Sequence, residues 1–167
     1  ISLGGTDAGN YALQNTIAST TANITQASLS VTGATAANKV YDATTGASVS
    51  GGVVTALGSD SVSLSAANAS FADKNVGTAK AITTAYSLSG TDAANYNLVQ
   101  ASGLTADITA KTLTASYVGS NKVYDATTSA SVTGSSSDII SGDTVSFSQS
   151  AAFADKNVGA GKSISIT

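Results

Sequence analysis

Apolar and polar residues alternate along several short stretches of the chain. Residues 61–65 read Ser-Val-Ser-Leu-Ser, residues 162–166 read Lys-Ser-Ile-Ser-Ile, and residues 104–108 read Leu-Thr-Ala-Asp-Ile. Because successive side chains of a strand point to opposite faces, this period of two predicts strands with one buried face. Gly- and Asn-rich breaks recur between the stretches, and helical capping boxes followed by an apolar helical period are missing. The pattern predicts an all-β chain.

Three sequence blocks occur twice in the same order. The block at 39–45, Lys-Val-Tyr-Asp-Ala-Thr-Thr, returns 83 positions later at 122–128. The block at 71–77, Phe-Ala-Asp-Lys-Asn-Val-Gly, returns 82 positions later, and the block at 5–11 returns with one change 85 positions later. Blocks that recur at one long period indicate two copies of one module of about 83 residues.

The end of the chain continues into its beginning in register. Lys80 lies 12 positions before Asp92, and Lys162 lies 12 positions before Asp7 when Thr167 is joined to Ile1. We therefore expect a two-module window on a longer tandem array, or a subunit that joins head to tail with copies of itself.

Residues 92–98 place Asp, a small residue, Tyr and an apolar residue at every second position, and residues 7–13 repeat this arrangement. The spacing resembles the tyrosine corner of immunoglobulin-like sandwiches, in which the Tyr hydroxyl binds backbone a few residues upstream. The fold that we expect is a series of immunoglobulin-like antiparallel β-sandwich modules arranged head to tail. A β-solenoid is the main competitor, but its rungs are about 20–30 residues long, far shorter than this period.

On this interpretation the chain has three parts. Residues 1–26 are the closing strands of a preceding module, residues 27–110 are a complete repeat, and residues 111–167 are the opening strands of the following repeat. Strands of the complete repeat are expected at 29–31, 40–49, 62–71, 79–88, 96–99 and 104–108. The core and corner positions that we expect are Tyr11, Tyr41, Phe71, Tyr96, Tyr124 and Phe153.

Composition excludes several classes of function. The 167 residues contain no His, Cys, Met, Trp or Pro, every acidic residue is Asp, and every basic residue is Lys. Zinc, copper and haem sites lose their usual ligands, and Ser-His or Cys-His nucleophilic catalysis has no base or nucleophile. Seven scattered Lys in a chain of net charge -3 do not form a nucleic-acid surface, and no apolar run reaches the roughly 20 residues that span a bilayer. We therefore expect no enzyme, no catalytic residue and no cofactor.

Recurring aspartates raise the question of calcium. Asp42, Asp60, Asp73 and Asp7 each return in the second copy of their block. Calcium takes six to eight oxygen ligands, yet the Asp-x-Asp-x-Asp spacing and any Glu are missing. Aspartates in Gly-, Ser- and Asn-rich turns usually bind backbone amides instead. We expect no metal site, and calcium dependence stays open.

The repeated blocks resemble the YDG-type repeats of large bacterial surface proteins, including filamentous-haemagglutinin-like adhesins. The resemblance covers essentially the whole chain and is carried by residues 122–128, 153–159, 88–98 and 106–109. It implies secretion, surface display and tandem repetition, with no catalytic residue and no defined ligand. One departure is that Ala43 and Ala126 replace the glycine of the signature. If that glycine serves a positive φ, alanine implies a relaxed turn.

The function that follows as an expectation is structural: a stalk- or fibre-forming module of a large secreted adhesin or extracellular filament, at the cell surface or in a biofilm. Its partners would be neighbouring copies of the same repeat, head to tail, with lateral bundling of fibres. One alternative is a filament subunit that polymerises by β-strand complementation. Another is a module that binds a glycan or a protein directly through its loops.

Overall fold

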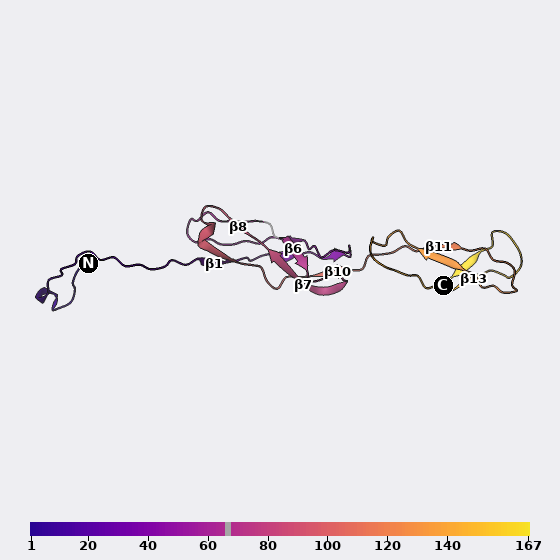
Figure 1. Cartoon of the computed structure of the whole chain (residues 1–167), viewed down its shortest axis with the longest axis horizontal. Coiled ribbons are helices and arrows are strands. Elements are labelled where there is room, and N and C mark those ends of the chain that lie inside the picture. The colour runs from indigo at the N-terminus through magenta and orange to yellow at the C-terminus, as the bar shows by residue number, and fades with distance from the viewer. Residues whose placement is uncertain (66–67) are drawn as a thin grey trace.

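The chain is built of short strands joined by turns. A computed structural model describes residues 1–65 and 68–167, and Figure 1 shows the two β-rich parts one after the other along the longest axis. Within the described residues the helical elements are two short 3-10 turns, η1 (Ala8–Asn10) and η2 (Ala93–Asn95). The expected all-β class is confirmed.

The first β-rich part holds ten strands. They are β1 (Ala27–Ser30), β2 (Thr35–Ala36), β3 (Lys39–Val40), β4 (Val49–Ser50), β5 (Ser63–Leu64), β6 (Asn68–Phe71), β7 (Gly77–Ala85), β8 (Leu88–Ser89), β9 (Tyr96–Val99) and β10 (Thr105–Thr109).

The last strand of this part lies in the middle of its main sheet. The sheet has the order β3-β10-β7-β6, so β10 pairs with both β3 and β7. Alternate residues of β10 are buried, and they pack with residues of β6 and β7 in a core of Phe71, Ile82, Ala106 and Ile108. Ile108 is only 1% exposed. The alternation of residues 104–108 therefore correctly predicts that one face of this strand is buried.

Two of the pairings are parallel, which corrects the expectation of a purely antiparallel fold. Strand β1 pairs with β9, and β3 pairs with β10, each in parallel register. In both pairs an early strand of the repeat meets a late one that runs in the same direction. The remaining pairs β2–β4, β5–β8, β6–β7 and β7–β10 are antiparallel.

The expected strands at 40–49 and 62–71 are wrong as continuous strands. The first is divided into β3 and β4 because Ala43 has a φ of 63°, which no extended strand contains. The second is divided into β5 and β6, and residues 66 and 67 of it lie outside the described residues. By contrast, β9 has the expected bounds Tyr96–Val99.

The second β-rich part is more open than the first. Strand β11 (Ser116–Gly119) pairs with β12 (Val132–Ser135), and β13 (Ala151–Phe153) pairs with β14 (Ile164–Ile166). Among the described residues of the first part eight apolar side chains are buried, whereas no side chain of residues 111–167 is buried. Residues 1–26, all of them described, carry η1 and no strand, and they extend away from the rest (Figure 1).

The molecule exposes more surface than a compact protein of its size. Its accessible area is 11570 Å², whereas a compact chain of 16.2 kDa exposes about 7,500 Å². The excess agrees with the extended outline in Figure 1.

Candidate functional site

The repeated block at 39–45 folds into a turn that is centred on a lysine. The Lys39 ammonium donates to Asp42 Oδ1 at 2.7 Å and to three oxygens of the following turn, Thr44 O, Thr44 Oγ1 and Gly46 O, at 2.9 to 3.1 Å. It also lies 5.6 Å from the centre of the Phe71 ring. The lysine thus closes the turn and covers the core at the same time.

The second copy of the block forms the same turn. Lys122 donates to Asp125 Oδ1 at 2.8 Å and to Thr127 O and Thr127 Oγ1, and its ammonium lies 5.7 Å from the centre of the Phe153 ring. The bond from Lys39 to Gly46 O has no counterpart at Lys122, but the other contacts recur in a more open part of the chain, which indicates that the turn is specified locally by its own residues. We call the two turns, residues 39–46 and 122–129, the lysine turns.

The middle of each lysine turn is strained. Ala43 and Ala126 both have a φ of 63°, a left-handed conformation that costs an L-residue about 1–2 kcal/mol. The expectation that alanine relaxes the turn is wrong. Hydrogen bonds from Thr44 N and Thr44 Oγ1 to Asp42 Oδ1, with the Lys39 contacts, hold the backbone in this conformation despite the Cβ.

Electrostatics at the lysine turns favour the charged carboxylates. The hydrogen bond from Lys39, followed by the one from the Thr44 N–H, lowers the pKa of Asp42 from 3.8 to about 2. Lys122 and Thr127 lower the pKa of Asp125 to about 2 in the same way. At neutral pH both carboxylates are ionised acceptors, so neither is suited to act as a general acid.

A second repeated turn follows β6 and β13. Asp73 Oδ1 accepts the Asn75 N–H at 2.8 Å and the Lys80 ammonium at 2.7 Å. Asp155 accepts the Asn157 N–H at 2.7 Å and an ion pair from Lys162. The aspartates of these blocks therefore bind backbone amides and lysines, as the turn interpretation of the sequence holds.

Tyr96 occupies a buried corner, but its hydroxyl group reaches further than the sequence pattern implies. It donates to Asp60 Oδ2 at 2.6 Å and accepts the Leu57 N–H at 3.0 Å. These partners lie 36 and 39 positions upstream, not the few residues of the expected tyrosine corner. Both partners belong to the turn of residues 57–60, which the Asp60 N–H closes on Leu57 O and which lies against the Tyr96 hydroxyl.

The six expected core and corner positions are not equivalent. Phe71 and Tyr96 are buried, whereas Tyr41 and Phe153 are partly buried. For Tyr11 and Tyr124 the expectation is wrong in this structure, because Tyr11 lies in the extended segment 1–26 and Tyr124 lines an open groove. Sequence reasoning missed Tyr86, which is buried and donates its hydroxyl to Gly51 O.

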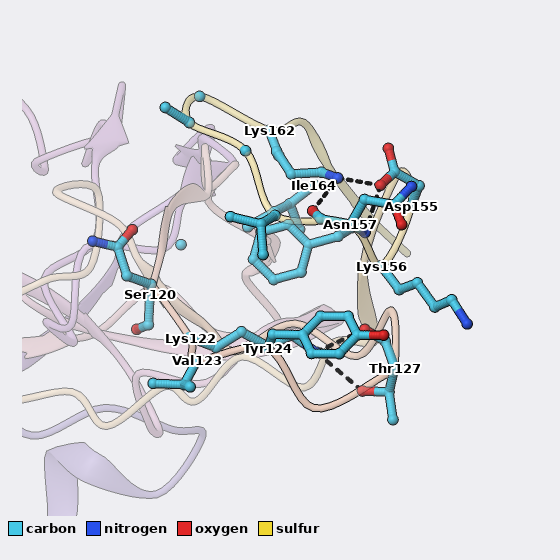
Figure 2. A pocket seen from close by; sticks show the side chains of 17 residues that line it. Ser120, Lys122, Val123, Tyr124, Thr127, Asp155, Lys156, Asn157, Lys162 and Ile164 are labelled. Carbon is cyan, nitrogen blue, oxygen red and sulfur yellow. Dashed lines mark hydrogen bonds and ion pairs between the residues drawn. The ribbon is translucent and has the colours of Figure 1, made fainter.

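The groove lies in the second β-rich part and has a volume of about 890 Å³. Figure 2 shows the labelled side chains of Tyr124, Lys122 and Ile164 around it, and Asn121 and Gly159 also line it. Its walls are residues 119–127 and 153–164.

The corresponding residues of the first part are covered by β10. Ile108 is paired with Lys39 and Gly77, and the Asp107 N–H donates to Asn38 Oδ1 at 2.7 Å. The counterparts of Lys39, Gly77 and Asn38 are groove residues. The groove therefore corresponds to the place that β10 fills in the first part.

We also searched the described residues for a metal site and for a membrane-spanning helix. Among residues 1–65 and 68–167 there is no cluster of three acidic side chains that would bind a metal ion. Nor does any helix in that part of the chain have the length and apolar character needed to cross a bilayer.

Comparison with known protein families assigns the chain to one of them. A sequence model of the YDG domain matches residues 25–103 and again residues 109–167. The chain belongs to the YDG domain family. It carries two YDG repeats in tandem, and each contains one lysine turn. No curated protein and no solved structure matches the chain.

Proposed function

We propose that this chain is a structural segment of the stalk or fibre of a large secreted bacterial adhesin, in which YDG repeats follow one another head to tail. The observation that best supports this is the pair of YDG repeats with closely similar lysine turns, which lie one after the other along the long axis. In each repeat two lysines pair with aspartates of that repeat's own turns. The proposal includes an extracellular location, an immunoglobulin-like sandwich and no catalysis.

The test is to compare chains of one, two and three fused copies of the 167 residues by small-angle X-ray scattering. The maximum dimension should grow in proportion to the number of copies. A maximum dimension that levels off would contradict a stalk. Immunolabelling of intact bacterial cells that produce the protein, before and after protease treatment, tests the surface location.

A second candidate is a filament subunit that polymerises by strand complementation. Residues 21–25 read Thr-Ala-Asn-Ile-Thr and differ from β10 at one position, and Ile24 is fully exposed. The open groove of the second repeat has the place for such a strand. A strand donated by another copy would complete the sheet.

Sedimentation velocity over a range of protein concentrations tests this candidate. Polymers should grow with concentration, and Ile24→Asp should abolish them. Ile17→Asp, at another exposed position of the same segment, is the matched control and should leave them intact. A chain that stays monomeric at every concentration contradicts strand complementation.

A further inference from the structure

One carboxylate of the second YDG repeat is bound by the first repeat. Asp143 Oδ2 accepts the Tyr41 hydroxyl at 2.8 Å, and Asp143 Oδ1 accepts the Lys74 ammonium at 3.2 Å. Asp143 ends a turn in which its N–H binds Ile140 O at 3.0 Å. Both donors come from the first repeat, so these contacts join the two repeats.

The three side chains form one compact cluster. The Lys74 ammonium lies 5.9 Å from the centre of the Tyr41 ring, within the range of a cation–π contact. The Asp143 side chain is only 20% exposed. Its hydrogen bonds from Tyr41 and then Lys74 lower the pKa of its carboxyl group. The charged form of Asp143 is therefore the one that the junction binds.

Each repeat carries both halves of this junction. Tyr124 and Lys156 stand at the positions of Tyr41 and Lys74. Asp60 stands at the position of Asp143; it is exposed, its Oδ2 accepts the Tyr96 hydroxyl of its own repeat, and within the described residues its Oδ1 accepts no hydrogen bond. Tyr124 is 56% exposed, and Lys156 makes no ion pair with the described residues. Figure 2 shows the two side chains extending toward the same side.

We infer that Tyr124 and Lys156 form a carboxylate-binding socket for the aspartate turn of another YDG repeat, as Tyr41 and Lys74 bind the turn of Asp143. The partner is thus a further copy of this repeat, recognised through a single ionised Asp. The inference rests on the proposed function only for the presence of that further copy in the same chain.

The socket is built for a tethered partner. A single exposed ion pair is weak, and it changes a docked-to-undocked ratio by about fivefold at most. A short linker raises the effective concentration of the attached repeat to about the millimolar range. The contact therefore orients neighbouring repeats along one chain, and separate chains at micromolar concentration should not associate through it.

Distances between spin labels test the socket in a chain of two fused copies. Because the protein has no cysteine, Ser148→Cys in the first copy and Thr55→Cys in the second, both at exposed positions, give two unique labelling sites. We expect one narrow distance distribution. Tyr124→Phe with Lys156→Met in the first copy should broaden it and lower the docked-to-undocked ratio by up to about fivefold.

The matched experiment uses the junction already present. In the 167-residue chain with both labels, Asp143→Asn should broaden the distribution, and Tyr124→Phe should leave it unchanged. Circular dichroism melting of each variant identifies any that fails to fold. Raising NaCl on the unmutated fused chain should also broaden the distribution, because exposed ion pairs are screened by salt.

The outcomes separate the two proposals. A distribution that stays narrow in the folded Tyr124→Phe, Lys156→Met variant overturns the socket, even if scattering still shows a stalk. A fused chain that is compact in scattering overturns the stalk, whatever the socket variants do.

Discussion

At the residue scale, Lys39 and Lys122 cover aromatic rings that larger apolar side chains cover in sequences with more of them. Each ammonium group bonds an aspartate and the following turn and lies over a phenylalanine ring, the core residue Phe71 in the first repeat and the partly buried Phe153 in the second. With nine aromatic residues and no Trp or Met, the chain has few large side chains to cover its core. The aliphatic part of the lysine side chain covers apolar surface, while its ammonium group closes the turn.

The strained alanines give a prediction on stability. Glycine relieves about 1–2 kcal/mol of left-handed strain but loses about 0.4–1 kcal/mol through the unfolded chain. Ala43→Gly should therefore raise the free energy of unfolding of the first repeat by about 0.5–1 kcal/mol in urea titrations. Ala37→Gly, at an exposed position of the same repeat without positive φ, should lower it or leave it unchanged. A loss of stability in Ala43→Gly would contradict the strain.

The lysine turns also predict how stability depends on pH. Asp42 and Asp125 have pKa values of about 2 in the fold and 3.8 as their ordinary value. A carboxyl group whose pKa is lowered by folding stabilises the fold fully at pH values above its unfolded pKa. This stabilisation is lost as the pH falls through the folded pKa. The melting temperature should be nearly constant from about pH 7 to 5 and should fall steeply between about pH 4 and 2.

The control for this pH profile is the double variant Asp42→Asn, Asp125→Asn. It should melt at a lower temperature at neutral pH and show a shallower fall in acid. Asp73, Asp143 and Asp155, whose pKa values are also lowered, account for the fall that remains. An unchanged profile would show that the lysine turns do not contribute.

At the scale of the element, β10 has the largest effect on the first repeat. It joins β3 to β7 and supplies Ala106 and Ile108 to the core. Its Asp107 side chain adds a hydrogen bond to the Ala79 N–H at 2.8 Å. Removing the packing of one strand should therefore weaken the whole sheet.

The chain offers a matched pair of isoleucines for this test. Ile108→Ala should lower the free energy of unfolding by about 2–5 kcal/mol, because the substitution removes three buried carbon atoms and leaves a cavity. Ile24→Ala, in the exposed segment that repeats β10, should change it by less than about 0.5 kcal/mol. Chemical denaturation followed by circular dichroism measures both. Equal losses of stability in the two variants would contradict the conclusion that β10 holds the main sheet together.

How far the sequence predicts these elements depends on whether the information is local. Alternation located β9 and β10, because period two reports which face is buried. It did not predict the break at Ala43, where side-chain contacts of Lys39 and Asp42 override an extended pattern. Alternation also could not predict which strands pair, because it shows which face of a strand is buried but not which strand lies beside it. The junction of Tyr41 with Asp143 joins residues 102 positions apart, and its only sequence signal was the recurrence of Asp60 at Asp143.

At the scale of the whole molecule, the two YDG repeats differ in how well they are closed. The first buries eight apolar side chains, and residues 111–167 bury none. The turns are the same in both, so the difference lies in the strand that covers the core.

Hydrogen exchange should report this difference directly. Backbone amides of β7 and β10 should be strongly protected, and those of β13 and β14 should exchange much faster, because few buried contacts hold them closed. Mass spectrometry of peptides covering 77–85 and 151–166 makes the comparison. Equal protection in the two regions would mean that the groove is closed in solution.

The position of β10 has a consequence for a chain that emerges through a narrow pore with its N-terminus first. The strand that completes the main sheet is the last one of its repeat and inserts between two strands already outside. A repeat therefore stays unfinished until residue 109 has emerged, and then closes at once around a central strand. Repeats of one chain should therefore complete in the order in which they emerge, and an unfinished main sheet should exist at any moment only in the repeat that is still emerging.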